Sequence, residues 1–412
     1  MNRSRVLVCF LLVTLFTISG IEVQAQVKAG IEVLRERNFD LLKGKRVGLV
    51  TNPTGVDSQL RSTIDILHEH VNLVALFGPE HGVRGEFSAG DHVGNQVDER
   101  TGIPAYSLYG KNRKPDRETL ELVDVIVYDI QDVGVRSYTY ISTMGLVMEA
   151  AAELDKEVVV LDRPNPLGGN RVEGPLVAEG FHSFVSQYKI PYIYGLTCGE
   201  LALFLNAEGM LKDGVKCRLQ VVPMDGWNRE MTFDRTGLQW VPASPHIPDY
   251  RTAFYYPATG IIGELDPNMI GIGYTLPFQV MVTENIDAQR LADAMNGLGM
   301  EGVVFRPIYF KPYYMAKKGK PLQGVQIHLT DPGTAVLTEI QFWFLQEAHK
   351  LDPSFNPFEG KKDRYRMFDY GCGSDQLRTS MMVDFNFQQL LEFWTRDSDA
   401  FRERSEKYYL YK

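Results

Sequence analysis

Cysteine is scarce in this chain, which has four among its 412 residues. Cys9 lies in an apolar N-terminal stretch, and Cys198, Cys217 and Cys372 are widely separated, with no CxxC spacing. Cysteines at such positions do not form a disulfide framework, a structural zinc site or a dithiol redox centre. We therefore expect buried free thiols and at most one disulfide bond.

Basic residues are also in the minority. The chain has 43 Lys and Arg against 52 Asp and Glu, which gives a formal net charge of −9 at pH 7. Proteins that bind nucleic acid through its phosphates need a basic face, so we expect no nucleic-acid partner. The overall composition is otherwise that of an ordinary globular protein.

Several catalytic and binding motifs are absent. The chain has no GxxxxGK(S/T) loop for phosphates and no GxSxG turn for a hydrolase serine. The Gly271-Ile272-Gly273 run lacks the third glycine of a dinucleotide-binding loop. His68 and His70 are two residues apart, a spacing that points them in different directions on a helix. We therefore expect neither a cofactor nor a bound metal.

The first 25 residues have the pattern of a secretory signal peptide. Arg3 and Arg5 precede an apolar run from Val6 to Ile18, and Val23-Gln24-Ala25 follows as a cleavage site. The run is too short for a membrane span, so we expect no stable membrane insertion. We expect cleavage after Ala25 and a periplasmic or secreted protein.

Short β-branched runs alternate with helix-like stretches through residues 26–240. Strands are expected at 47–51, 73–77, 123–129, 158–162 and 219–222. Helices are expected at 60–70, at 140–154 and after Thr197, where Glu200 gives capping-box spacing. This alternation is typical of an α/β domain with a parallel sheet and helices on both faces.

After residue 240 the sequence changes character. Residues 242–277 are rich in Pro, Gly, Asn and Tyr, so we expect an irregular segment there. Strands are expected at 279–283 and near Val303 and Val325, and helices at 288–298, 334–350 and 385–395. We interpret residues 241–412 as a smaller C-terminal α/β subdomain that forms a cleft with the first domain. The aromatic runs at 254–256 and 309–314 could belong to a core, a cleft or an interface.

Four of the expected strands end in polar residues and turn formers. The carboxyl ends of parallel strands gather at one edge, where ligands bind in open α/β folds. The most informative turn is Gly78-Pro79-Glu80-His81-Gly82, with Arg84 close behind. Such a lining suits a ligand with hydroxyl and amide groups, such as a sugar. The other candidate residues at these ends are Asn52, Asp129, Gln131, Arg136, Tyr138, Asp162, Asn165 and Arg171.

Structural roles are the alternative for several of these residues. Asn52 could be a plain turn former, Asp162 and Asn165 could fix an Asx-turn, and His81 could be a satisfied structural histidine. Glu80 differs, because a glutamate between Pro and His in a glycine-flanked turn adds nothing to helix or strand formation. We therefore expect a functional role for Glu80.

At these residues the sequence resembles the bacterial exo-β-N-acetylmuramidases of peptidoglycan recycling (glycoside hydrolase family 171, formerly a domain of unknown function). The resemblance extends from Ala29 to the C-terminus. One departure stands at Glu264-Leu265-Asp266-Pro267, where many relatives have Glu-Gly-Thr-Asn. Several specific blocks occur in the family's order, at 48–55, 75–82, 129–136, 162–169 and 271–278.

The resemblance implies removal of a terminal β-1,4-linked N-acetylmuramic acid from the non-reducing end of peptidoglycan fragments. It also implies a Rossmann-like domain that carries the active site and a smaller domain that closes the cleft. Glu80 matches the family's proposed catalytic acid. Glycoside hydrolysis commonly needs a second carboxylate, for which Glu264, Asp129 and Asp162 are candidates, and the 2-acetamido group of the substrate is a further alternative.

The substrate of such an enzyme carries a lactyl carboxylate. Arg84, Arg136 or Arg171 could pair with it, because a guanidinium matches a carboxylate in geometry and charge. Two rival functions are a non-catalytic periplasmic protein that binds muropeptides or sugars, and a metal-dependent amidase acting on the lactyl-peptide bond. Peptidoglycan-derived muropeptides are the expected partners.

Overall fold

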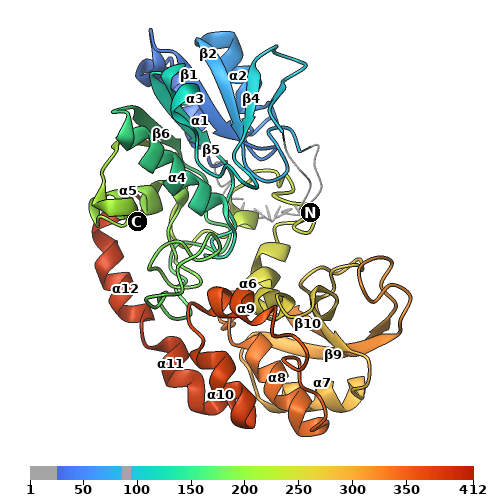
Figure 1. Cartoon of the computed structure of the whole chain (residues 1–412). Helices are drawn as coiled ribbons and strands as arrows, with labels where there is room; N and C mark the ends of the chain where they lie inside the picture. Colours follow the sequence, from blue (N-terminus) through green and yellow to red (C-terminus); the bar gives the residue numbers. More distant parts are fainter. Residues whose placement is uncertain (1–25, 86–93) are drawn as a thin grey trace, which may run out of the picture.

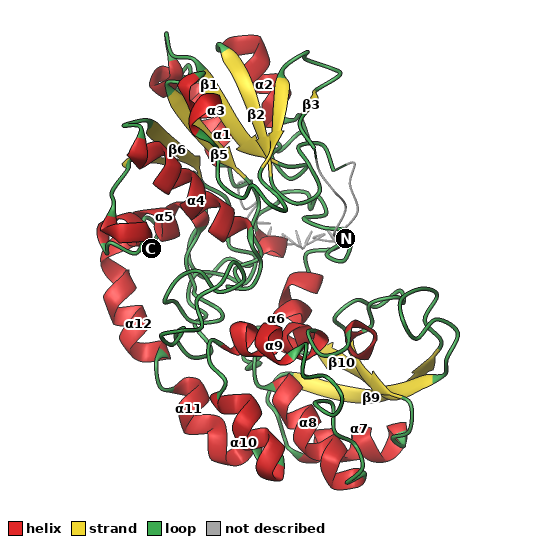
Figure 2. Cartoon of the chain, viewed as in Figure 1, coloured by secondary structure: helices red, strands yellow, loops and turns green. Residues whose placement is uncertain are grey.

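The computed structural model describes residues 26–85 and 94–412, and the predicted signal peptide at 1–25 lies outside the described residues. The chain folds into two α/β halves, each built on its own sheet (Figure 1). The first half has a seven-stranded sheet flanked by helices, and the second has a three-stranded sheet (Figure 2). The predicted fold class, a mainly parallel sheet domain with a smaller α/β part, is confirmed.

The large sheet has the strand order β3-β4-β2-β1-β5-β6-β7, and only the β3–β4 pair is antiparallel. The five predicted strands are confirmed to within two residues at either end. Strands β3 and β4, which lie beyond β2 at one end of the sheet, were not predicted, because they are short and β4 begins with a proline. The strands are β1 (Val47–Thr51), β2 (Leu73–Gly78), β3 (Gln96–Val97), β4 (Pro104–Ser107), β5 (Val125–Asp129), β6 (Glu157–Leu161) and β7 (Arg218–Val222).

Helices cover both faces of this sheet, as the sequence predicts. Leu49 and Val127 point to one apolar cluster, and their neighbours Val50 and Tyr128 point to the other. Successive residues of a strand face opposite sides, so the fully buried strands β1 and β5 serve both clusters. The first cluster includes α1 (Gly30–Glu36) and α2 (Thr63–His70), and the second includes α3 (Arg117–Glu121), α4 (Tyr140–Glu153) and α5 (Cys198–Ala207).

Local signals explain the helix starts. Thr197 caps α5 and forms the predicted capping box with Glu200. Helix α2 begins at Thr63, so the predicted start at Leu60 is wrong. Leu60 has a φ of 62°, in a turn that precedes the helix, and Ser62 is the residue that caps it by accepting a hydrogen bond from a backbone N–H.

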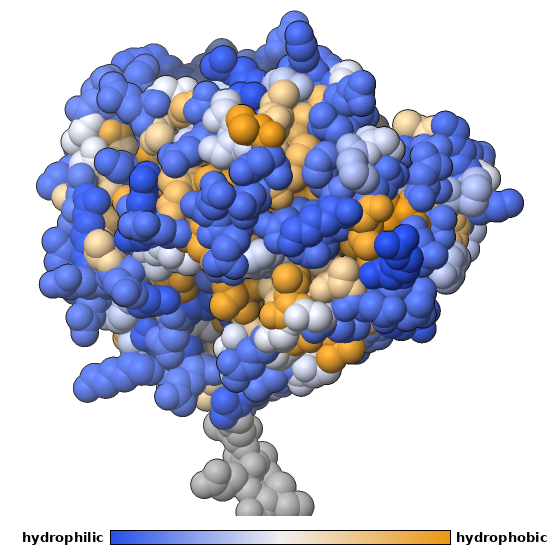
Figure 3. All heavy atoms as spheres, turned by 90° about the horizontal axis from the view of Figure 1, so that it is seen from below, coloured by the Kyte–Doolittle hydropathy of each residue, from blue (hydrophilic) through white to orange (hydrophobic). Residues whose placement is uncertain are grey.

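The small sheet is antiparallel, in the order β8-β10-β9. Its strands are β8 (Val280–Thr283), β9 (Val303–Phe310) and β10 (Leu322–Leu329), and α7 (Ala288–Gly297) covers it, all near the predicted positions. The face of this half seen from below is mostly hydrophilic, with scattered apolar residues (Figure 3). The other helices are α8 (Ile340–Leu351), α9 (Tyr365–Cys372), α10 (Gln376–Asp384), α11 (Leu391–Thr395) and α12 (Ser398–Ser405).

The segment predicted to be irregular contains a buried helix, α6 (Thr252–Gly263). The prediction was wrong because Pro257 lies inside this helix, where a proline normally breaks the hydrogen-bond ladder. One turn after the proline, the buried side chain of Gln341 from α8 bridges backbone groups of this helix. Its Nε2 donates to the Pro257 carbonyl at 2.9 Å, and its Oε1 accepts from Ile261 N at 3.0 Å. No local pattern can predict a helix completed by a residue 80 positions away.

The C-terminal residues return to the first half, where the chain ends near α5 (Figure 1). The Tyr411 hydroxyl donates to Asp162 Oδ2 at 2.6 Å and accepts from Met224 N at 2.9 Å. Leu410 N donates to Glu200 Oε1 at 2.9 Å. The chain therefore crosses between the two halves a second time.

Cys198, Cys217 and Cys372 are free and buried, as predicted. Burial raises the pKa of the Cys217 thiol to about 11, which keeps it protonated near neutral pH. Across residues 26–85 and 94–412, no helix has both the length and the apolar character needed to span a membrane.

Candidate active site

The strand order of the sheet reverses between β1 and β5, so the carboxyl ends of these two strands form a topological switch point. The two strands are neighbours, but the chain leaves β1 for β2 on one side and leaves β5 for β6 on the other. Ligands bind at such switch points in open α/β sheets. The loops that follow the two strands meet there, since Gln131 N donates to Thr54 Oγ1 at 2.8 Å.

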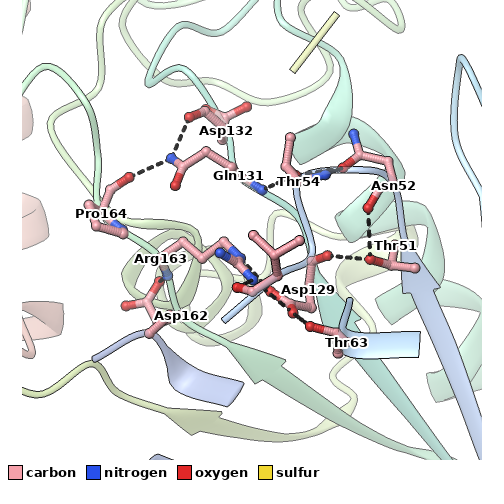
Figure 4. A network of polar contacts seen from close by, with 12 residues as sticks. Thr51, Asn52, Thr54, Thr63, Asp129, Gln131, Asp132, Asp162, Arg163 and Pro164 are labelled. Carbon is pink, nitrogen blue, oxygen red and sulfur yellow. Dashed lines mark hydrogen bonds and ion pairs between the residues drawn. The ribbon is translucent and has the colours of Figure 1, made fainter. Parts of the chain in front are cut away.

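A buried polar network lies beneath the switch point (Figure 4). Asp129, at the end of β5, forms an ion pair with Arg163 and accepts a hydrogen bond from Thr63 Oγ1 at 2.5 Å. Arg163 also donates to the Val56 carbonyl at 2.7 Å. Asp129 is fully buried, and both of its carboxylate oxygens have partners inside the protein.

Three other predicted residues also hold loops together. Asp162 accepts hydrogen bonds at the start of α5, and burial raises its pKa to about 6. Gln131 Nε2 donates to the Pro164 carbonyl at 2.7 Å. Asn165 Oδ1 accepts from Leu167 N at 3.0 Å, so the Asx-turn interpretation of Asn165 is confirmed.

The arginines predicted for the lactyl carboxylate are bonded within the protein. Arg84 forms ion pairs with Asp98 and Asp65, and this guanidinium lowers the pKa of Asp98 to about 2. Arg171 donates to a neighbouring glutamate and to carbonyl groups of the loop at 332–335.

Arg136 is 1% exposed and has no carboxylate partner among the described residues. Its guanidinium donates to a serine hydroxyl in the first half and to the carbonyls of Pro175, Ile190 and Gly371. Burial lowers its pKa to about 10. Because Gly371 belongs to α9, this buried cation joins the two halves of the chain.

The turn after β2 presents Glu80 at the same edge of the sheet. Gly82 N donates to the Pro79 carbonyl at 3.1 Å, and the buried His81 has a φ of 76°, which is uncommon for a residue with a side chain. Glu80 is half-buried and shares a hydrogen bond with the Tyr109 hydroxyl. Burial, with a contribution from this carboxylate, raises the pKa of Tyr109 to about 12.

An aromatic cluster of Tyr138, Tyr140 and Tyr256 lies near Glu80. The ring centroids of Tyr138 and Tyr140 are 5.0 Å apart, and those of Tyr138 and Tyr256 are 5.6 Å apart, both edge to face. Burial is the main cause that raises the pKa of Tyr140 and Tyr256, and the Glu80 carboxylate contributes to both. Glu264 and Asp132 also raise the pKa of Tyr256, so the charges of three carboxylates act on this tyrosine.

Asp132 was missed by the sequence predictions, although it lies only three residues after Asp129 in the same polar block. Its Oδ2 accepts from Gly134 N at 2.7 Å and from the Tyr194 hydroxyl. Its Oδ1 has no hydrogen-bond partner in the described part of the chain. Burial raises the pKa of Asp132 to about 6. The sequence signal that could have identified Asp132 was a second acidic residue just after the end of β5.

Near the tyrosine cluster, two other buried polar atoms lack a hydrogen bond of normal geometry to any described residue. Asn52 Oδ1 accepts from Thr54 N at 3.0 Å, as a turn former does, but its Nδ2 beside the Tyr140 hydroxyl is unsatisfied. The Tyr138 hydroxyl beside Ser244 is also unsatisfied. Buried polar atoms normally have partners, so these atoms are available to water or to the polar groups of a ligand.

Two further residues lie near the site, Glu264 of the second half and His246 of the segment that leads into it. Glu264 follows α6; Arg364 donates to its carbonyl at 2.7 Å and lies 3.5 Å from its Oε2. Burial raises the pKa of Glu264, and Arg364 opposes this rise. Burial lowers the pKa of His246, and the nearby His81 contributes. Since Glu80 also raises the pKa of Tyr256 in α6, the turn that carries Glu80 lies close to residues of both halves.

Comparison with known proteins identifies the family. The family described as exo-beta-N-acetylmuramidase NamZ matches this chain with its N-terminal part at residues 47–251 and its C-terminal part at residues 254–411. This chain belongs to that family. The resemblance inferred from the sequence is thereby confirmed.

Relatives of this exo-β-N-acetylmuramidase family member cover almost its whole length. A protein of Bacillus subtilis (strain 168) named peptidoglycan beta-N-acetylmuramidase NamZ is 40% identical over 388 residues, which are 94% of this chain and 92% of the relative. Crystal structures of two DUF1343 family proteins from Bacteroides fragilis NCTC 9343 have 55% and 29% identity, with TM-scores of 0.90 and 0.76. Each covers 94% of this chain and 99% of its own.

Proposed function

We propose that this family member hydrolyses the β-1,4 bond of a terminal N-acetylmuramic acid at the non-reducing end of peptidoglycan fragments, with Glu80 as the general acid. Family membership and the activity named for the Bacillus subtilis relative support the reaction. The observation that carries the assignment of Glu80 is its position. It is a half-buried carboxylate at the carboxyl edge of the sheet, bonded to Tyr109 and next to a tyrosine cluster with unpaired polar atoms.

The chemistry requires one proton transfer at the glycosidic oxygen. The carboxylic acid of Glu80 gives its proton to this oxygen as the C1–O bond breaks, and the leaving sugar departs with a hydroxyl group. A water molecule supplies the new hydroxyl on C1, and its second proton returns to Glu80. Tyr109 holds the carboxyl group of Glu80 in one orientation during both steps.

A second polar group must act on the other side of the sugar. Asp132 and Glu264 converge with Glu80 on Tyr256, whereas Asp129 and Asp162 have their oxygens occupied within the protein. The unpartnered Oδ1 of Asp132 suits an N–H donor, and the 2-acetamido group of muramic acid offers one. We assign Asp132 to orienting this group, which can serve as an internal nucleophile in hexosaminidases.

Arg113 is the arginine we assign to the lactyl carboxylate. Its guanidinium lies over the Phe184 ring at 4.2 Å from the centroid, and it forms no ion pair with any residue in 26–85 or 94–412. Its positive charge opposes the rise in the pKa of the Tyr109 hydroxyl, which is hydrogen-bonded to Glu80. An available guanidinium at this position would select N-acetylmuramic acid over N-acetylglucosamine, which lacks the carboxylate.

We also propose that the protein is exported. The charged and apolar pattern of residues 1–25 and a substrate from the cell wall support this location. N-terminal sequencing of the protein from the periplasm or the medium should begin at Gln26. An intact Met1 on protein confined to the cytoplasm would overturn the proposal.

The deciding experiment incubates the mature protein with the disaccharide of N-acetylmuramic acid β-1,4-linked to N-acetylglucosamine. Mass spectrometry should detect free N-acetylmuramic acid. Glu80→Gln should reduce its release by roughly 10²–10⁴-fold. Glu69→Gln is the matched control, because Glu69 lies on the surface of α2 in an ion pair with Arg61.

Each other outcome has a distinct meaning. Equal release by Glu80→Gln would remove Glu80 from the mechanism and leave Glu264 as the next acid to test. Recovery of bound, intact disaccharide would support a receptor instead of an enzyme. Cleavage of the lactyl-peptide bond of a muropeptide, abolished by a chelator, would support an amidase.

A further inference from the structure

Three consecutive large side chains are exposed on the loop between β9 and β10. Tyr313 is 62% exposed, Tyr314 is 46% exposed and Met315 is 47% exposed. Single hydrophobic residues are normal on a protein surface, but a contiguous group on one loop indicates a binding surface. The two aromatic runs noted in the sequence thus have different roles, since Phe254 is in the core and Tyr256 lies in the candidate site.

The aromatic rings of this region are ordered against one another. Tyr313 packs on Tyr274, with 5.6 Å between ring centroids, and Tyr274 in turn stacks on Phe310 at 4.0 Å. The Tyr314 ring lies at 15° to the ring of His246, and its hydroxyl is 3.0 Å from His246 Nε2. We refer to Tyr274, Tyr313, Tyr314 and His246 as the aromatic ledge.

The backbone beneath the ledge is held in place by contacts with the turn at 266–273. Tyr313 N donates to the Gly273 carbonyl at 2.7 Å. Gly273 has a φ of 97°, and a Cβ there would approach the Tyr314 carbonyl oxygen to 2.6 Å, so the close contact requires glycine. Lys317 forms an ion pair with Asp266 at 3.0 Å, within the block where the chain departs from its relatives. Because the loop is already ordered, little conformational entropy is lost when its rings bind a ligand.

The aromatic ledge lies next to the candidate active site. His246 contacts Tyr314 and lies near His81, the residue after Glu80. The loop lies on the side of the second half that is directed toward the first half (Figure 1). The ledge is therefore within reach of a sugar chain whose terminal unit is held at Glu80.

The charge of the loop also fits a peptidoglycan fragment. Lys311, Lys318 and Lys320 are exposed and form no ion pair with the described residues, in a chain whose net charge is −9. Peptide stems and lactyl groups carry carboxylates, so a local positive charge complements longer fragments.

We propose that the aromatic ledge binds the sugar on the leaving side of the scissile bond, an N-acetylglucosamine unit, by stacking the apolar C–H face of the pyranose on its rings. Tyrosine combines a flat apolar face with a polar edge, which suits a ligand that has C–H groups on its faces and hydroxyl groups around its rim. The lysines face the anionic stem of longer fragments. This inference rests on the proposed function, because it takes the leaving sugar of that reaction as the ligand.

Equilibrium binding tests the ledge without relying on turnover. The ligands are N-acetylmuramic acid alone and a sulfur-linked disaccharide of N-acetylmuramic acid and N-acetylglucosamine, which resists hydrolysis. Titration calorimetry of the double variant Tyr313→Ala/Tyr314→Ala should show a roughly tenfold higher Kd for the disaccharide, since aromatic stacking of two rings contributes about that much. The Kd for the monosaccharide should not change.

Two further variants sharpen the test. Tyr314→Phe keeps the ring, so its Kd for the disaccharide should stay within about twofold of the wild-type value. Tyr309→Ala is the matched control, because Tyr309 is 63% exposed on β9 but lies outside the ledge. It should bind both ligands as the wild type does.

The results separate this proposal from the proposed function. An unchanged disaccharide Kd in the double variant, or an equal rise in Kd for both ligands, would overturn the proposal that the ledge binds the leaving sugar. A selective rise in a protein that never cleaves the oxygen-linked disaccharide would support the ledge as a binding site and remove the muramidase function. Failure of the wild type to bind either ligand would overturn both the ledge proposal and the proposed function.

Discussion

The hydroxyl of Tyr109 shares a hydrogen bond with the carboxylate of Glu80. Tyr109 follows β4 and Glu80 follows β2, and these two strands are parallel neighbours. The bond therefore joins two loops at the carboxyl edge of the sheet. It gives strand β4 a direct part in positioning the proposed acid.

Removal of the Tyr109 hydroxyl should slow catalysis. A hydrogen bond to a charged group contributes about 1.5–3 kcal/mol, so Tyr109→Phe should lower kcat by roughly 10- to 100-fold with little change in KM. Steady-state kinetics on the disaccharide checks this. Tyr408→Phe is the control, because Tyr408 forms an equivalent bond of 2.6 Å to Glu208 away from the site. Wild-type kcat in Tyr109→Phe would show that the bond does not position the acid.

Asp132→Asn should change how stability depends on pH. Burial raises the pKa of Asp132 from its ordinary value of 3.8 to about 6, so the folded state binds a proton more readily than the unfolded chain. The stabilisation linked to this proton is complete below about pH 4 and is lost as the pH rises through 6. The neutral asparagine has no such loss. The Tm of the variant relative to wild type should therefore be higher at pH 7.5 than at pH 4, and a constant difference would argue against a buried charge.

Arg113→Gln should weaken the preference for muramic acid. Loss of a charge-assisted contact with the lactyl carboxylate should lower kcat/KM for p-nitrophenyl β-N-acetylmuramide by roughly 10- to 100-fold. Residual activity on the corresponding N-acetylglucosaminide, which has no carboxylate, should stay the same. Arg117→Gln on α3 serves as the control, since that side chain is 74% exposed. A parallel loss on both substrates would refute a role in selectivity.

Asp129 should prove to be structural. Breaking a buried ion pair by removing one partner costs about 3–5 kcal/mol, so Asp129→Asn and Arg163→Met should each lower the free energy of unfolding by that amount. The double variant Asp129→Leu/Arg163→Met should lose less than the two single variants together, because no unpaired charge is left buried. Urea denaturation measures all three. An Asp129→Asn protein with wild-type stability and no activity would instead make Asp129 catalytic.

The strands around the site were predictable because they are buried on both faces of the sheet. Helices cover both faces of the parallel sheet, so β1, β5 and β6 appear in the sequence as continuous apolar runs. Strand β4 has four residues, begins at Pro104 and carries no such run. Tyr109 and Arg113 follow β4, so the sequence predictions missed them together with the strand.

The sequence predicted which polar residues gather at the sheet edge but not where each side chain points. Asp129 is the last residue of β5 and turns toward Arg163, whereas Asp132 lies in the loop beyond and leaves one oxygen unpaired. Arg136 shows the same limit. It appeared available for a substrate carboxylate, but it is buried among carbonyl groups, one of them from Gly371. Partners so distant in sequence cannot be read from local patterns.

The return of the C-terminal tail to the first half has a mechanical consequence. The halves are joined covalently near residue 250, and Tyr411, bonded to Asp162, ties them a second time. Closure of two domains on a ligand requires the segments that join them to bend together, so this second tie restricts rotation of one half against the other. We therefore expect the two halves to move little relative to each other during turnover. On this expectation, an enzyme that removes one terminal sugar at a time can admit each new chain end and release each sugar without a domain-opening step.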